Sequence, residues 1–250
     1  MQNDVTTLTT AMSATAGATP EGRTLETLLR RRHSCRAFLD RPVERETVMH
    51  ILETAQLTAS WCNAQPWQLH IATGAPLARF RDGLLAAAVS EPPRPDLPFP
   101  AEYPDVYLER RRECGWRLYD SVGIVKGDRA ASARQGLENF RLFGAPHVVI
   151  VTTPAKMGVY GAIDCGAYVA AFMLAAESVG VASIAQAALA SYPDIARRCL
   201  GIADDRLVVC GISFGFEDTA HPANRFRTVR AAVSEAVVWV DDVLDGWSAA

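Results

Sequence analysis

The sequence predicts an α+β fold, in which a central sheet carries helices on both of its faces. Four apolar runs have the length and residue types of buried strands, and several longer segments place apolar residues at helical spacing. These strands and helices do not alternate regularly at the start of the chain, which argues against a simple βαβ arrangement. The chain has 250 residues, of which 49% are hydrophobic and 21% charged, enough for one substantial core.

The first half of the chain is expected to be mainly helical. Thr24 can cap a first helix, whose apolar face is formed by Leu25, Leu28 and Leu29. A second helix follows Pro42 and has its apolar face at Val48, Ile51, Leu52 and Ala55. The run WQLHIAT (67–73) is predicted to be a strand, and a third helix covers about residues 77–89. Six prolines then exclude regular structure over 91–104 before two helices at about 105–124 and 129–142.

The second half contains three more predicted strands, HVVIVTT (147–153), VASIAQ (181–186) and RLVVCGISFGF (206–216). An apolar helix is expected over 161–180 and a short one over 192–201, and the tail 234–247 fits either a helix or a strand. The apolar run 165–176 is too short to span a bilayer and is bounded by Asp164 and Glu177. We therefore expect it to be buried in the core or at a subunit interface.

The pattern indicates one domain over residues 23–250, because patterned helices continue on both sides of the proline-rich stretch. Residues of about 91–140 form an excursion from that domain. Residues 1–22 lack the basic and apolar regions of a secretory signal. They are expected to be a flexible arm, either loose or wrapped around a partner.

Composition narrows the functional classes. The net charge is −3 and the pI about 6.0, which disfavours a nucleic acid partner. The five histidines are scattered and form no HExxH motif, so no dedicated metal site is expected. The six cysteines form no CxxC motif and are typical of reduced thiols in a cytoplasmic protein.

Two basic islands are candidate phosphate sites. RRRHSCR surrounds Ser34 with the four arginines Arg30, Arg31, Arg32 and Arg36, and NRFRTVR supplies Arg225, Arg227 and Arg230 beside Thr228. Guanidinium groups bind phosphate through paired hydrogen bonds, and hydroxyl groups add further donors. The alternative is that each island is a solvated helix end.

Two other segments could contact a flat heterocycle. In SWCNAQPW (60–67), the amides of Asn63 and Gln65 can read an edge with mixed donors and acceptors, unless the segment only ends a helix and anchors Trp67. In GVASIAQAALASYPD (180–194), small residues let a ligand approach the backbone, unless they serve only close packing. No G-x-G-x-x-G, Walker A or G-x-S-x-G motif is present.

Taken in order, several segments resemble the FMN-dependent nitroreductase family. They are RRHSCRAF, ASWCNAQPWQLHIATG, FRLFGAPHVVIVTT, the run from Asp164 to Ile202 and VVCGISFGFEDTAHPANRFRTVR. The proline-rich excursion and AQAALASYPD are similar to the branch that contains nitrobenzoate and nitrobenzene reductases. The resemblance implies a three-layer α/β/α sandwich with a mixed, mainly antiparallel sheet. It also implies an intertwined homodimer with two FMN sites at the subunit interface.

The resemblance also implies roles for individual residues. The FMN phosphate would be held by Arg32, Ser34, Arg36 and Arg230, with His33 beside them and Arg227 as a helper. The ribityl chain and ring would face Ser60, Asn63 and Gln65, from the partner subunit, and the backbone of Ala185, Gln186 and Ala187. Trp61 and Cys62 are bulkier than the residues that many relatives have there and would reshape the acceptor pocket. Trp116 and Tyr119 would cap that pocket, unless they only anchor their helix to the core.

The implied activity is ping-pong hydride transfer from NADPH or NADH, through flavin N5, to a nitroaromatic or quinone-like acceptor. No side chain is expected to act as a catalytic acid, base or nucleophile, because the flavin carries the chemistry. One alternative is a flavoenzyme of this fold that dehalogenates or dehydrogenates a specific metabolite. Another is a flavin-binding dimer without enzymatic activity. No membrane partner is expected.

Overall fold

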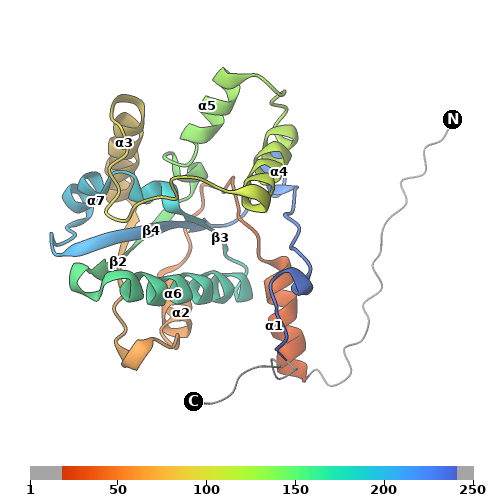
Figure 1. The fold of residues 1–250 in the computed structure, drawn as a ribbon. Coiled ribbons are helices and arrows are strands. Elements are labelled where there is room, and N and C mark those ends of the chain that lie inside the picture. Colours follow the sequence, from red (N-terminus) through yellow and green to blue (C-terminus); the bar gives the residue numbers. More distant parts are fainter. Residues whose placement is uncertain (1–18, 241–250) are drawn as a thin grey trace, which may run out of the picture.

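The computed structural model describes residues 19–240, and its centre is a four-stranded sheet in the order β1-β2-β4-β3 (Figure 1). The strands are β1 (Gln68–Thr73), β2 (His147–Pro154), β3 (Ala182–Gln186) and β4 (Arg206–Gly215). Every pair of neighbouring strands is antiparallel. The parallel component in the described chain is a single bridge between Ser34 and Ser183. All four predicted strands and the mainly antiparallel sheet are confirmed.

The central strand β2 divides its side chains between two apolar cores. Val148 and Ile150 belong to one core, while Val149 and Val151 belong to the other. This alternation follows from the two-residue period of a strand, which directs successive side chains to opposite faces. A continuous apolar run such as HVVIVTT is therefore the pattern of a strand that is covered on both faces.

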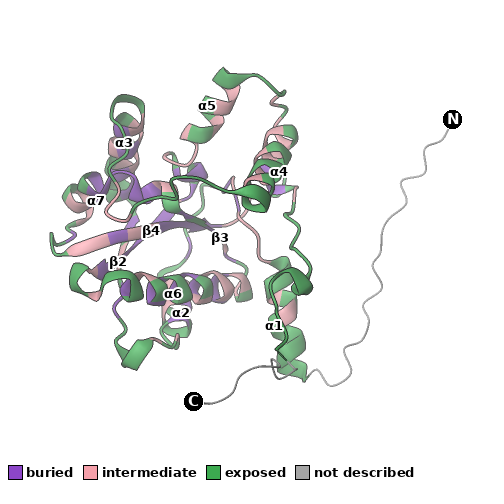
Figure 2. Cartoon of the chain, viewed as in Figure 1, coloured by how far each residue is buried: buried purple, intermediate pink, exposed green. Residues whose placement is uncertain are grey.

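Helices cover each face of the sheet, and burial is concentrated where they meet it (Figures 1 and 2). On one face lie α3 (Gly74–Ser90) and α7 (Pro193–Leu200), which contribute Phe80, Leu84 and Ala196 to the first core. On the other lie α2 (Arg45–Ala55) and α6 (Gly158–Ser178), which contribute Ile51, Tyr168 and Phe172 to the second. The predicted three-layer arrangement is confirmed.

Helix α1 (Pro20–Arg31) begins earlier than the sequence suggested. Its N-cap is Thr19, whose hydroxyl accepts a hydrogen bond from the Gly22 backbone N–H at 3.1 Å. The prediction that Thr24 caps this helix is wrong, because the Thr24 hydroxyl donates to the Pro20 carbonyl from within it. Residues 20–22, expected in the flexible arm, are helical, and the remainder of that arm, 1–18, lies outside the described residues.

The excursion consists of α4 (Asp105–Ser121) and α5 (Arg129–Leu137). Helix α5 is shorter than predicted, because it ends at Leu137 and turns follow it. Beyond these turns Leu142 and Phe143 are buried and take left-handed backbone conformations, with φ of 59° and 52°. In the tail, Val233–Glu235 is a single 3₁₀ turn. Residues 236–240 form neither the helix nor the strand that was considered, and 241–250 lie outside the described part.

Helix α6 (Gly158–Ser178) is longer than the apolar run 165–176, and its two faces differ in burial. With the turn before it, the segment Ala155–Ser178 has 24 residues and contains an 18-residue window with a mean hydropathy of 1.5, so length and composition alone would allow it to cross a membrane. In the fold, one face packs on β2, β3 and α2. The opposite face leaves Val159, Tyr160 and Ile163 more than half exposed. One face of this helix is thus buried in the core, and burial of the exposed face at a subunit interface stays a prediction.

Candidate functional site

A cavity of about 510 Å³ lies between β3, the segment that follows α1, and the two excursion helices. It brings together residues that are far apart in the sequence. The candidate residues among those that line it are Ser34, Arg36, Trp116, Tyr119, Ala185, Gln186 and Ala187. The remaining wall comes mainly from α4 and the end of α5.

The segment after α1 reaches this cavity because it runs along the outer edge of β3. Ser34 forms the parallel bridge with Ser183, and the Cys35 backbone N–H donates to the Ser183 carbonyl at 3.2 Å. Cys35 is fully buried, and burial raises the pKa of its thiol to about 12. The alternation of an extended chain then directs Ser34 and Arg36, on either side of Cys35, to the cavity.

Arg36 is a half-buried cation that makes no ion pair within the described residues. Its backbone N–H donates to Asn224 Oδ1 at 2.7 Å, and its guanidinium donates to the Ser34 carbonyl at 3.2 Å. The guanidinium also lies 5.3 Å from the centre of the Phe226 ring. Burial lowers the pKa of Arg36, because the partly desolvated guanidinium has no carboxylate beside it to stabilise its charge. Such a site is suited to an anion.

The edge of β3 offers backbone groups to the cavity. The Ser183 carbonyl accepts a hydrogen bond from Cys35, so the backbone polar groups of Ser183 point away from β4. Because backbone direction repeats every two residues in a strand, those of Ala185 point the same way. The N–H and C=O of Ala185 therefore point to the outer edge, where the bridging segment has ended and the cavity begins. These groups can bond to a flat ligand with polar atoms along its rim.

The Gln186 side chain is fixed inside the protein. Its Nε2 donates to the Asn139 carbonyl at 2.9 Å, and its Oε1 accepts from the Ser213 hydroxyl at 2.6 Å. These bonds join β3 to β4 and to the excursion. Asn139 was not identified from the sequence, because only the fold brings the end of α5 beside β3.

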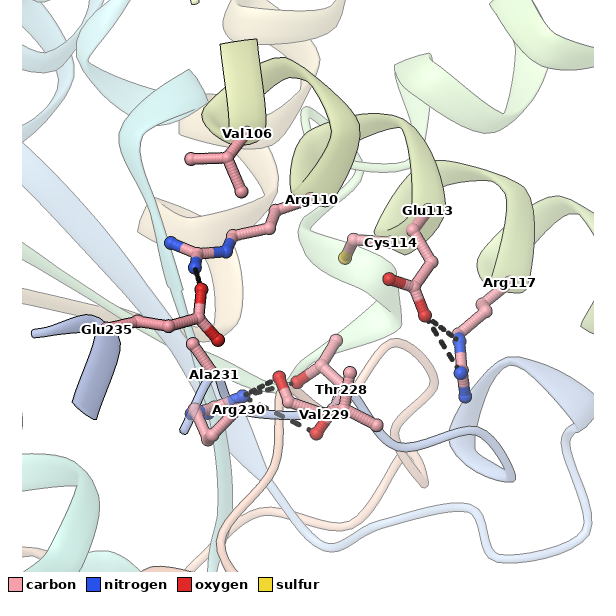
Figure 3. A pocket seen from close by; sticks show the side chains of 10 residues that line it. All are labelled: Val106, Arg110, Glu113, Cys114, Arg117, Thr228, Val229, Arg230, Ala231 and Glu235. Carbon is pink, nitrogen blue, oxygen red and sulfur yellow. Dashed lines mark hydrogen bonds and ion pairs between the residues drawn. The ribbon is translucent and has the colours of Figure 1, made fainter. Parts of the chain in front are cut away.

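The other basic candidates surround the cavity without lining it. The Arg32 side chain has no hydrogen bond or ion pair within residues 19–240, whereas His33 Nε2 lies 3.1 Å from Glu217 Oε1. Arg227 donates to the Asn224 carbonyl at 2.7 Å. Arg230 donates to the Thr228 hydroxyl at 2.8 Å and lines a neighbouring cavity of about 410 Å³ against α4 (Figure 3). Cys114 lines both cavities, so they adjoin there.

The loop Ser60–Gln65 lies elsewhere on the molecule, at the outer side of the α2–α6 layer, far from α4 (orange in Figure 1). Its backbone is strained, with φ of 50° at Cys62, 54° at Asn63 and 46° at Gln65. The buried Asp164 anchors the loop by accepting a bond from the Trp61 N–H at 3.2 Å. Non-glycine residues in this conformation often mark functional sites.

The four aromatic and thiol candidates separate into two groups. Trp116 and Tyr119 line the 510 Å³ cavity, and their ring centres lie 5.8 Å apart in an edge-to-face arrangement. Trp61 belongs to the distant loop and packs on Tyr160 of α6, with ring centres 4.5 Å apart. Cys62 is exposed in the same loop. Within one chain, Trp61 and Cys62 therefore do not meet the cavity.

Comparison with known proteins gives consistent matches. The model of the Nitroreductase family matches residues 29–216. Nitroreductase NfnB of Mycolicibacterium smegmatis is 35% identical over 84% of this chain and 90% of its own length. A 4-nitrobenzoate reductase of Nocardioides sp. strain LMS-CY is 33% identical over 90% of this chain and 94% of its own.

Solved structures agree with these matches. The structure of FMN-dependent nitroreductase NfnB from Mycobacterium smegmatis in complex with NADPH has a TM-score of 0.84 and 33% identity, and covers 88% of this chain and 99% of that one. The FMN and NADPH-dependent nitroreductase NfnB from Sphigopyxis sp. strain HMH has a TM-score of 0.83 and 33% identity. It covers 86% of this chain and 98% of that one.

Proposed function

The chain belongs to the nitroreductase family, and from that premise we propose that it is an FMN-dependent oxidoreductase. It uses NADPH or NADH to reduce nitroaromatic or quinone-like acceptors. One observation carries this proposal furthest, namely that a single cavity combines the unpaired Arg36 with the open backbone edge at Ala185. The Arg36 guanidinium can bind a phosphate, and the backbone groups of Ala185 can bond to the polar rim atoms of a flavin ring. Relatives described as NADPH-dependent nitroreductases support the same function.

Arg32, Ser34 and Arg36 would hold the FMN phosphate, with His33, Arg227 and Arg230 beside them. The backbone of Ala185, Gln186 and Ala187 would bond to the rim of the ring. Bound FMN supplies the hydride-accepting and hydride-donating chemistry. The chain's own task is to bind and orient, so no side chain serves as catalytic acid, base or nucleophile. Trp116 and Tyr119 would form the wall that excludes water and positions an aromatic acceptor.

We further propose that the enzyme is a homodimer, in which Ser60, Asn63 and Gln65 complete the cofactor site of the partner subunit. Two observations support this. The strained loop that holds them is anchored by Asp164 but lies far from the cavity of its own chain. The outer face of α6, the helix that carries Asp164, is apolar and exposed within the described chain, from Val159 and Ile163 to Ala170. A second copy that covers this face would bring Trp61 and Cys62 towards the acceptor pocket.

We place the enzyme in the cytoplasm. All six cysteines are free thiols, and burial raises the pKa of Cys35, Cys165 and Cys210, to about 12, 11 and 12 respectively. Such thiols stay protonated and unreactive, which fits a reducing compartment.

The visible spectrum of the purified protein, followed by anaerobic addition of NADPH and separately of NADH, tests the proposed function. We expect flavin absorption bands that bleach with at least one donor and return when 4-nitrobenzoate or a quinone is added. A flavin that bleaches but is reoxidised by neither acceptor would favour dehalogenation or dehydrogenation of another substrate. A colourless protein that cannot be reconstituted with FMN would contradict the proposal.

A further inference from the structure

Four arginines of α4 fall into two pairs with different surroundings. Arg110 forms an ion pair with Glu235 at 2.9 Å, and Arg117 forms one with Glu113 at 2.9 Å. Both pairs line the neighbouring cavity, where Figure 3 shows each guanidinium turned to its carboxylate. Arg111 and Arg112 make no ion pair in the part of the chain that the structure describes.

The two unpaired arginines line the 510 Å³ cavity of the candidate site, on the wall opposite β3. Together with Arg36 they give its lining three guanidinium groups, and no Asp or Glu is among the lining residues. The Arg111 guanidinium lies 5.1 Å from the centre of the Tyr103 ring, a contact that steadies the side chain without neutralising it. On a chain of net charge −3, this positive cavity is a local feature.

The proposed cofactor accounts for only part of this charge. Its phosphate is assigned to the segment after α1, which includes Arg36. Arg111 and Arg112 come from a different element and leave positive charge for a second anion. They lie on the same helix as Trp116 and Tyr119, four to eight residues earlier, which is about 6–12 Å along the helix axis. This wall therefore has a cationic end and an aromatic end.

We propose that Arg111 and Arg112 form an anion subsite that selects reactants carrying both an aromatic ring and a charged oxygen group. This inference rests on the proposed function. Two reactants supply that chemistry, the 2′-phosphate of NADPH and the carboxylate of an aromatic acid acceptor. Guanidinium groups bind both kinds of group by paired, charge-assisted hydrogen bonds. The subsite acts in binding and takes no part in hydride transfer.

The test compares Arg111→Ala/Arg112→Ala with Arg110→Ala/Arg117→Ala, which removes the same charge from the same helix but outside the cavity. The kcat/KM is measured with NADPH and NADH, and with 4-nitrobenzoate and nitrobenzene. We expect the first variant to lose roughly 10- to 100-fold with NADPH or with 4-nitrobenzoate, and little with NADH or nitrobenzene, which lack the 2′-phosphate and the carboxylate respectively. Loss confined to NADPH identifies the phosphate, and loss confined to 4-nitrobenzoate identifies the carboxylate.

A binding measurement separates this inference from the proposed activity. Tryptophan fluorescence is titrated with adenosine 2′,5′-bisphosphate against 5′-AMP, and with benzoate against benzamide. Tighter binding to the wild type of adenosine 2′,5′-bisphosphate than of 5′-AMP, or of benzoate than of benzamide, supports the subsite if it is lost in Arg111→Ala/Arg112→Ala alone, even if no turnover is found. Equal losses for both members of a pair, equal effects in both variants, or no loss would overturn it.

Discussion

At the scale of single residues, the site is distinguished by cations that lack carboxylate partners. Arg32 and Arg36 have no ion pair within residues 19–240, whereas the nearby Arg30 pairs with Glu26 and Arg31 with Glu177. A run of arginines that reads as uniform in the sequence is thus divided by the fold. Those that precede the end of α1 are neutralised, and those that follow it remain available for an anion.

The substitution Arg32→Ala should weaken FMN binding by about 1.5–3 kcal/mol, because it removes a charge-assisted contact with the phosphate. This corresponds to roughly a tenfold to hundredfold higher Kd, measured by flavin fluorescence during reconstitution of the apoprotein. Arg30→Ala is the matched control, since Arg30 is exposed and already paired. Equal affinity in Arg32→Ala and the wild type would remove Arg32 from the phosphate site.

Buried His147 should make stability sensitive to acid. Its Nε2 accepts a hydrogen bond from the Val43 N–H at 2.8 Å, and its ring stacks on Phe214. Burial lowers its pKa below the ordinary value of 6.5, so the folded state binds a proton later than the unfolded state. The contribution of neutral His147 to the free energy of unfolding is complete above pH 6.5. It is lost as the pH falls through the lowered pKa of His147 in the folded state.

His147→Gln keeps a hydrogen-bond acceptor but cannot titrate, so its urea midpoint should fall less steeply below pH 6.5 than that of the wild type. His70→Gln is the comparison, because burial lowers the pKa of His70 as well and part of the slope belongs to it. Identical pH dependence in His147→Gln and the wild type would contradict this assignment.

Sequence reasoning found the candidate residues that lie in short ordered motifs. Ser34, Arg36 and Ala185 could be identified because each lies within a short recognisable sequence motif. The fold brings all three to one cavity. Asn139 and Asn224 were missed, since each acts through a contact with a segment far away in the chain. The ion pairs that separate Arg111 from Arg110 are likewise tertiary, because Glu235 comes from the tail.

At the scale of elements, strands were easier to predict than helix ends. The clearest case is β2, which is buried on both faces, and this burial leaves a continuous apolar run in the sequence. Helix ends depend on local backbone choices instead. The apolar pattern continues past α5 to Leu142 and Phe143, yet the helix ends at Leu137 and these two residues are buried in left-handed conformations.

Helix α6 should tolerate little bulk where it crosses β2. A Cβ added at Gly161 would overlap the Thr153 hydroxyl and the Met157 Cβ. Gly161→Ala is therefore expected to lower the free energy of unfolding by about 1–3 kcal/mol, measured by chemical denaturation. At Gly166, in the same helix, an added Cβ meets no atom of the chain within 4 Å, so Gly166→Ala is the control. Equal stability of the two variants would argue against close packing at this crossing.

At the scale of the whole molecule, the strained loop and the cavity lie apart in one chain, so in the proposed dimer each site is completed by the loop of the partner. Ile163 on the outer face of α6 is 58% exposed, and Ile163→Glu should convert the proposed dimer to a monomer that retains little FMN. Sedimentation velocity and the flavin-to-protein absorbance ratio measure both effects.

Val89→Glu, at the far end of α3, changes another exposed apolar residue, which is 71% exposed, and should leave assembly intact. A dimeric, flavin-loaded Ile163→Glu variant would contradict the proposed interface. The intertwining expected from the resemblance belongs to this proposed assembly and stays a prediction, because no feature of the single chain tests it.

The open edge of β3 has a consequence for the newly made, empty protein. An unpaired strand edge is a template for strand addition by another chain, and proteins usually cover or charge such edges. Here the bridging segment protects the edge only as far as Ser183, and alanines follow it. FMN would then act as a solubility factor as well as a reagent. Light scattering of the apoprotein should rise on warming and be suppressed by FMN, and cells short of riboflavin should accumulate less of the soluble enzyme.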